Sequence, residues 1–222
     1  MYRRHFILAT LGLTAVGISA AADSSASAAV KAASNQSGKL VLVVGDSLSA
    51  EYGLARGSGW VALLERQLKA EKLAVQVVNA SISGDTTSGG AARMASLLAQ
   101  HKPSHVVIEL GANDALRGLP VKLTEDNLTK MTQAAQKSGA KVLLVGMQLP
   151  PNYGAEFGAR FAGTFATVAR ANQAALVPFM LKGVADIANP LALFQADRVH
   201  PKAEAQPIIL ANIWPELKKI LK

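Results

Sequence analysis

Ser47 lies where a serine nucleophile is expected, just beyond an apolar run that ends at Gly45. The run over residues 39–45 is typical of a strand buried on both faces of a parallel sheet. Ligands of open α/β sheets bind beyond the carboxyl ends of the strands, so we expect Ser47 to face a crevice. Asp46 and Ser47 are also ordinary cap and turn residues, so this turn alone does not separate a catalytic role from a structural one.

Two more predicted strands end in the same way. Residues 75–79 lead into a loop over 80–90, and residues 105–110 lead into the loop 111–114. Each loop places glycine beside small polar side chains, and glycine permits tight turns and close approach of the backbone. Because the carboxyl ends of parallel strands meet at one edge of a sheet, the three loops together predict a site.

A serine hydroxyl needs a general base, and the base needs a third group that fixes its tautomer. The chain has four histidines. Three of them are poorly placed: one in a targeting segment, one at a predicted helix end, and one at a strand entrance on the opposite edge of the sheet, namely His5, His101 and His105. His200 is therefore the candidate base.

His200 precedes Pro201, which keeps it out of helical geometry and is expected at the first position of a following helix. Asp197, three residues earlier, is close enough in sequence to hydrogen-bond the ring. In the competing interpretation Asp197 caps a turn and His200 is a solvated loop residue. The three polar loops upstream lead us to prefer the catalytic pair.

Several chemistries lack their sequence signals. The chain has no cysteine and no Gly-x-Ser-x-Gly elbow, which argues against thiol catalysis and the α/β-hydrolase fold. It also has no His-Glu-x-x-His, Gly-x-x-x-x-Gly-Lys or Gly-x-Gly-x-x-Gly motif. We therefore expect neither a metal nor a cofactor.

The formal charge of +8 does not indicate a nucleic-acid partner. Arg3, Arg4 and Lys31 precede the predicted fold, and most other basic residues are scattered without interleaved aromatic residues. A basic surface still attracts anionic membranes or acidic substrates over a screened range.

Four short motifs together resemble those of the SGNH hydrolases, also called GDSL esterases. Their order matches that of the family, and the similarity spans roughly residues 39–222. Residues 79–86, 149–154 and 205–207 resemble most closely the branch of periplasmic acyl-CoA thioesterase I, lysophospholipase and arylesterase enzymes. Glu51 departs from that branch, which commonly carries glycine there. The four motifs are Gly45-Asp46-Ser47-Leu48-Ser49, Ser83-Gly84-Asp85-Thr86, Gly111-Ala112-Asn113-Asp114 and Asp197-Arg198-Val199-His200-Pro201.

The resemblance implies a role for each motif. Ser47 would be the nucleophile, His200 the general base and then acid, and Asp197 the orienting carboxylate. The oxyanion hole would consist of the backbone N–H groups of Ser47 and Gly84 and the side-chain amide of Asn113. These groups suit the task, because glycine lets a backbone donor approach and a neutral amide donates without competing for a proton.

Strand and helix patterns alternate along the chain. They predict an α/β flavodoxin-like three-layer fold, with a central parallel sheet and helices on both faces, in a single SGNH hydrolase domain over residues 39–222. The patterns place strands at 141–146 and 176–178, besides those above. Predicted helices cover 60–73, 90–100, 124–138 with Thr124 as the cap, 157–174 and 201–221.

Residues 1–22 resemble a secretory signal peptide, with a charged start, an apolar stretch and small residues at 19–21. Arg3 and Arg4 also suit a twin-arginine signal. Residues 23–38 are rich in Ala and Ser and are predicted to be a flexible leader. We expect a periplasmic or secreted protein with no stable membrane span after cleavage, although an uncleaved anchor is the alternative.

The predicted activity is that of a serine esterase and thioesterase working through an acyl-enzyme. Its small-molecule substrates would be short- to medium-chain acyl esters, aryl esters, acyl-CoA thioesters or lysophospholipids. Leu149 and Tyr153, in the loop 148–154, are expected to form an apolar wall for the acyl chain. The alternatives are a carbohydrate acetylesterase of the same family and a catalytically silent periplasmic binding domain. The oligomeric state is left open.

Overall fold

Five parallel strands form the centre of the computed structural model, which describes residues 38–222. Their order across the sheet is β2-β1-β3-β4-β5, which is the flavodoxin-like order. The predicted fold class is therefore confirmed. The strands are β1 (Lys39–Gly45), β2 (Val75–Asn79), β3 (His105–Glu109), β4 (Lys141–Val145) and β5 (Ala175–Val177).

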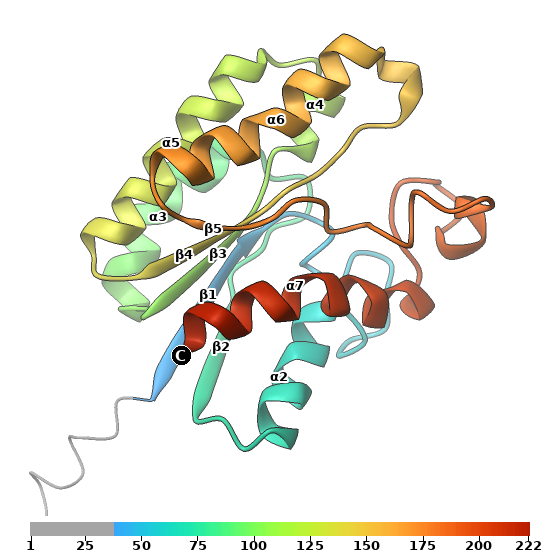
Figure 1. Cartoon of the computed structure of the whole chain (residues 1–222). Helices are drawn as coiled ribbons and strands as arrows, with labels where there is room; N and C mark the ends of the chain where they lie inside the picture. The colour runs from blue at the N-terminus through green and yellow to red at the C-terminus, as the bar shows by residue number, and fades with distance from the viewer. Residues whose placement is uncertain (1–37) are drawn as a thin grey trace, which may run out of the picture. The chain divides into compact units, whose positions relative to one another are not determined.

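Helices cover both faces of the sheet, as Figure 1 shows. Two of them pack together on one face, α2 (Trp60–Ala70) and α7 (Gln206–Leu221). Three pack side by side on the other face: α3 (Thr87–His101), α5 (Val121–Lys137) and α6 (Ala155–Ala171). The short helix α4 (Ala112–Leu116) follows β3 directly.

The chain reverses its direction across the sheet between β1 and β3. After β1 it passes through α2 to β2 on one side, and after β3 it passes through α5 to β4 on the other. Because such crossovers are right-handed, the two connections lie on opposite faces and leave a crevice between the ends of β1 and β3. This crevice receives the loops that carry Ser47 and Asn113.

The core follows the predicted patterns. Residues 41–44 of β1 have no exposed surface, as expected for a strand covered on both faces. Helix α2 buries Val61, Leu64 and Leu68, the apolar stripe that its sequence predicts, and Trp60 joins them.

Three predicted helix starts are wrong. The helix α3 begins at Thr87, before the predicted start at residue 90. Thr124 is not a cap: α5 begins after Pro120, and Thr124 is already buried in its first turn. Pro201 does not open α7, because it pairs with Phe194 in an antiparallel bridge. The helix α7 begins five residues later, and Pro207 occupies its first turn, where the missing N–H costs no hydrogen bond.

The carboxyl-terminal end of α7 lies beside the amino-terminal ends of the strands. The His105 ring lies 2.9 Å from the carbonyl oxygen of Ile220, and Lys141 Nζ donates to the same oxygen at 2.8 Å. Lys39 Nζ donates to the carbonyl of Leu221. His105 is thus a structural histidine, and burial lowers its pKa. Its predicted placement, at the end of the sheet opposite to the loop that carries Ser47, is confirmed.

The predicted signal peptide (1–22) and leader (23–38) lie outside the described residues, apart from Gly38. Within residues 38–222, no helix combines the length and apolar character that crossing a membrane requires.

Candidate active site

Ser47, His200 and Asp197 form a continuous hydrogen-bonded series. His200 Nε2 lies 2.9 Å from Ser47 Oγ, and His200 Nδ1 lies 2.7 Å from Asp197 Oδ2. Ser47 comes from the turn after β1, whereas the other two come from a segment that precedes α7. The structure therefore brings together the three side chains that the sequence analysis selects, although 153 positions separate Ser47 from His200.

A narrow hairpin presents Asp197 and His200 to Ser47. Gln195 donates its backbone N–H to the carbonyl of His200 at 2.8 Å, and Lys202 donates to the carbonyl of Leu193 at 2.8 Å. This pairing closes the chain on both sides of Asp197 and His200. The hairpin, and not a helix that starts at Pro201, therefore sets the position of His200.

Asp197 is held as an anion. Its Oδ1 accepts the backbone N–H groups of His200 at 3.0 Å and Val199 at 2.9 Å. These two bonds, followed by the bond from the His200 ring, lower the pKa of Asp197 to about 2. A charged acceptor at Nδ1 favours the tautomer with the proton on that nitrogen, which leaves the Nε2 lone pair for the Ser47 hydroxyl.

Three potential oxyanion donors follow β1, β2 and β3. Gly84 has a φ of +79°, a conformation that glycine adopts without strain. Its loop is tied to β1 because Ile82 donates its N–H to the carbonyl of Gly45 at 3.0 Å. Arg117 donates to the carbonyl of Gly84 at 2.7 Å and holds that peptide from the other side.

Asn113, in the first turn of α4, is oriented by its neighbours. Its Nδ2 donates to Asp46 Oδ2 at 3.0 Å, so one amide proton is engaged and the other is available. The adjacent Asp114 is buried and accepts the backbone N–H of Thr87 at 2.8 Å. This bond joins the loop after β3 to the start of α3.

Sequence reasoning missed Tyr52 and the function of Glu51. The Tyr52 ring packs on the His200 ring with a centroid distance of 4.3 Å. Glu51 has a φ of +60°, which explains why glycine suits this position, and its carboxylate accepts N–H groups from Gly57 at 3.0 Å and Gly59 at 2.7 Å. Glu51, the residue that departs from the family pattern, thus holds the loop that carries Tyr52 in place.

Leu149 and Tyr153 lie in the loop after β4, as predicted, and both are half-buried. Leu149 packs against the core, and Tyr153 ends a short 3-10 turn, Pro151–Tyr153. Within residues 38–222, neither makes a hydrogen bond or ring contact with Ser47 or His200. Their role in substrate binding stays a prediction.

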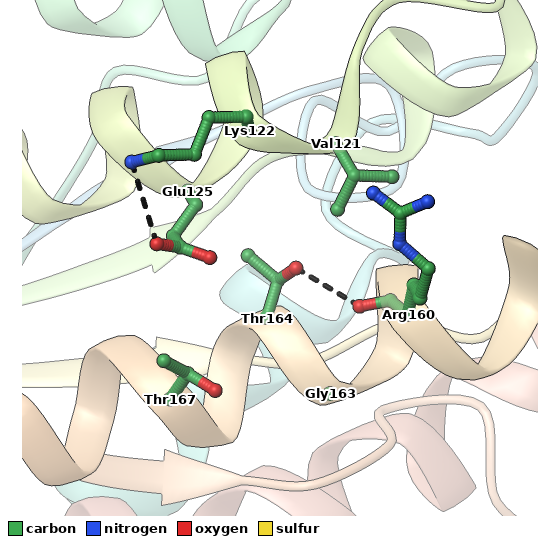
Figure 2. Close-up of a pocket in the computed structure, with 7 residues that line it drawn as sticks. All are labelled: Val121, Lys122, Glu125, Arg160, Gly163, Thr164 and Thr167. Carbon is green, nitrogen blue, oxygen red and sulfur yellow. Dashed lines mark hydrogen bonds and ion pairs between the residues drawn. The ribbon is translucent and has the colours of Figure 1, made fainter.

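A separate hollow of about 340 Å³ lies between α5 and α6 (Figure 2). Lys122 pairs with Glu125 there at 3.6 Å, and the Thr164 hydroxyl donates to the backbone carbonyl of Arg160 at 3.0 Å. None of its lining residues belongs to the series around Ser47. In the described part of the chain, no three His, Cys, Asp or Glu side chains are grouped to hold a metal ion.

A hydroxyl, an imidazole and a carboxylate in series, beside backbone and amide donors, form the arrangement that serine hydrolases use. Residues 43–207 match the model of the GDSL-like lipase/acylhydrolase family. The chain belongs to this family, and its assignment to the SGNH hydrolases from the sequence is confirmed.

Three named relatives are similar to this chain over most of their length. Esterase TesA of Pseudomonas aeruginosa is 51% identical over 82% of this chain and 89% of its own. An arylesterase of Vibrio mimicus is 43% identical over 85% and 93%. Thioesterase 1/protease 1/lysophospholipase L1 of Escherichia coli K12 is 39% identical over 82% and 84%.

The fold is similar to that of solved relatives. The crystal structure of TesA matches with a TM-score of 0.79 and 50% identity, over 82% of this chain and 99% of that one. The fold and the family together make this chain a hydrolase of the SGNH class.

Proposed function

We propose that this protein is a serine esterase and thioesterase that works through an acyl-enzyme. The observation that carries the proposal is the series from Ser47 through His200 to Asp197, with distances of 2.9 Å and 2.7 Å. The esterase, arylesterase and thioesterase names of the relatives support the same class of substrate.

In the first half of the reaction, Ser47 Oγ attacks the acyl carbonyl while His200 Nε2 takes the hydroxyl proton. The carbonyl oxygen becomes negative and accepts hydrogen bonds from the Ser47 and Gly84 N–H groups and from Asn113 Nδ2. His200 then gives its proton to the departing alkoxide or thiolate, which leaves an acyl ester on Ser47.

In the second half, water replaces the leaving group. His200 takes a proton from the water as it attacks the acyl ester, and the same three donors hold the second oxyanion. Collapse of this intermediate returns the proton to Ser47 Oγ and releases the carboxylic acid. Asp197 stays ionised throughout and stabilises the imidazolium that forms twice.

Apolar side chains around the site support substrates with an acyl chain. Four large exposed apolar side chains lie near the proposed site residues in the sequence: Tyr52, Ile82, Leu116 and Val199. We propose that this rim and the Leu149–Tyr153 loop contact the acyl chain. Each buried methylene is worth roughly 0.8 kcal/mol, so kcat/KM should rise with chain length until the binding surface is full.

Replacing Tyr153 with alanine should flatten the rise of kcat/KM with acyl length on p-nitrophenyl esters, because part of the apolar wall is lost. Leu73→Ala, a change of an exposed apolar residue outside the catalytic loops, is the control and should keep the wild-type profile. An unchanged profile in Tyr153→Ala would contradict the assignment. Activity confined to acetylated sugars would instead favour a carbohydrate acetylesterase.

Replacing Asn113 with alanine should lower kcat by about 10² to 10³ and change KM little, because the amide binds the oxygen mainly as charge develops. Steady-state kinetics and thermal unfolding should be measured on one preparation. A lower unfolding temperature with normal kcat would indicate that Asn113 is only a turn residue.

Covalent labelling distinguishes an active esterase from a catalytically silent binding domain. A fluorophosphonate should add once, to Ser47, and Ser47→Ala should not be labelled. Wild-type protein that neither reacts with the probe nor hydrolyses short p-nitrophenyl esters or acyl-CoA would favour the binding domain.

We further propose export to the periplasm through residues 1–22, followed by a leader to residue 38. Mass spectrometry of the protein from a periplasmic extract would give the cleavage site. Retention of the full-length chain in the membrane fraction would favour an uncleaved anchor.

A further inference from the structure

Glu109 is a buried acid that the proposed mechanism does not use. It is the last residue of β3, only 2% exposed, and lies beside the turn that carries Ser47. Gly45 permits this approach, because a Cβ there would lie 2.8 Å from Glu109 Oε2. A carboxyl group is costly to bury, so its partners indicate what it does.

The donors around Glu109 have a fixed direction. Trp60 Nε1 can only donate, and it donates to Ser49 Oγ at 3.2 Å. The Ser49 hydroxyl is therefore free to direct its own proton to Glu109 Oε2 at 2.7 Å, and the Asp46 N–H donates to the same oxygen at 3.3 Å. This oxygen is an acceptor, so any acidic proton of Glu109 is directed elsewhere.

The neighbouring acidic residue is Asp46, whose side chain belongs to a residue only 1% exposed and whose backbone N–H reaches Glu109 Oε2 at 3.3 Å. Burial, and then the charge of Asp46, raises the pKa of Glu109 well above its ordinary value. Burial also raises the pKa of Asp46, to about 6. Two adjacent buried carboxyl groups disfavour being charged together, so the pair tends to keep one proton, and the hydrogen bonds that Asp46 accepts favour the negative charge on Asp46.

Asp46 uses that charge to orient two groups of the site. Its Oδ1 accepts the N–H of Leu48 at 3.0 Å, which shapes the turn around Ser47, and its Oδ2 accepts Asn113 Nδ2 at 3.0 Å. Both carboxylate oxygens are therefore acceptors, a pattern that neither a protonated acid nor an asparagine can reproduce.

We propose that Glu109 is a positioning residue: its protonated carboxyl group donates to Asp46, and this bond keeps the Asp46 carboxylate aligned to hold the Asn113 amide toward the developing oxyanion. The inference rests on the proposed function, since it assigns Asn113 to the oxyanion hole. Glu109 does not touch the substrate and acts only through Asp46 and Asn113.

The arrangement should weaken as pH rises through the raised pKa of Glu109. The titratable groups that bear on the pair are each other and His200, whose charge acts on Asp46; Ser49 and Trp60 are neutral. A raised acid pKa means that the stability is present below the ordinary pKa and is lost as pH rises through the raised one. Loss of the Glu109 proton places two negative charges together and should release Asn113.

Two variants separate the proton from the shape of the side chain. In Glu109→Gln the amide oxygen still accepts from Ser49 and the NH₂ group still donates to Asp46, without a titration. We expect kcat within about threefold of wild type at pH 7, and a smaller loss of kcat and of unfolding temperature than in wild type as pH rises. In Glu109→Ala we expect kcat to fall about 10- to 100-fold with little change in KM, which is below the full effect of losing Asn113.

A double-mutant cycle with Asn113→Ala gives the decisive measurement. If Glu109 acts through Asn113, then Glu109→Ala should have little further effect on kcat in the Asn113→Ala background. Thermal unfolding shows whether each variant is folded, and the fraction of Ser47 that a fluorophosphonate labels gives the concentration of active molecules.

Three results would overturn the proposal: equal losses of kcat in Glu109→Gln and Glu109→Ala, a pH profile of Glu109→Gln identical to that of wild type, or a full loss of kcat from Glu109→Ala in the Asn113→Ala background. Failure of the proposed function is distinct, because wild-type protein would then show neither labelling nor hydrolysis.

Discussion

Replacing Ser47 or His200 with alanine is expected to remove nearly all turnover, by about 10⁶ in kcat, while the protein stays folded. The reason is geometric: Ser47 Oγ and His200 Nε2, 2.9 Å apart, share one proton-transfer step, so the loss of either group stops that step. The double variant should be little worse than either single variant. Hydrolysis of p-nitrophenyl esters, corrected for the folded fraction, measures both effects.

Matched controls are available on α3, away from the site. Ser96→Ala and His101→Ala remove the same side chains from the middle and the end of this helix and should keep normal kcat. The residual rate of the Ser47 and His200 variants should stay about 10³ to 10⁴ above the reaction in water, owing to substrate binding and the oxyanion donors. Near-normal activity of His200→Ala at neutral pH would show that the base is misassigned.

Replacing Asp197 with asparagine should lower kcat on the order of 10³. The change removes the charge that stabilises the imidazolium and can turn the His200 ring to the wrong tautomer, which costs about 10⁴ in buried triads. The Asp197 side chain is 38% exposed, so water replaces part of its effect and we expect the smaller loss. Kinetics at neutral pH, with KM measured separately, tests this value.

The pH profile gives an independent check on Asp197. Its pKa is lowered to about 2, so the stability it adds is complete above its ordinary pKa and is lost only as pH falls through about 2. Asp197 therefore stays charged through mildly acidic pH, and a fall of kcat/KM there should have another source. A loss of kcat/KM centred near the ordinary pKa of aspartate in wild type, and absent from Asp197→Asn, would contradict this.

The sequence was sufficient where a feature depends on neighbouring residues. The strands β1 and β3 are continuous apolar runs, and the turn after each carries small polar residues, so the edge of the sheet with Ser47 and Asn113 could be predicted. Elimination among four histidines left His200. The wrong helix starts at Thr124 and Pro201 show the limit, because a cap residue and a proline also occur within a helix and a hairpin.

The missed features depend on contacts between distant segments. Tyr52 packs on His200 only because the hairpin before α7 folds back over the turn after β1. Glu109 carried one usable signal, an acid at the end of the apolar run 105–109. Its partners Asp46, Ser49 and Trp60 come from other segments, and the run alone does not identify them.

The attachment of the end of α7 to the amino edge of the sheet has a practical consequence for immobilisation. This helix of 16 residues runs roughly 24 Å from Gln206 to Leu221, and Figure 1 shows its end beside the start of β1. Ser47 lies at the carboxyl-terminal ends of the strands. A tether joined after Lys222 would therefore attach to the side of the domain opposite to Ser47. Grafted to a surface in this way, each protein would present its catalytic crevice outward to the solution.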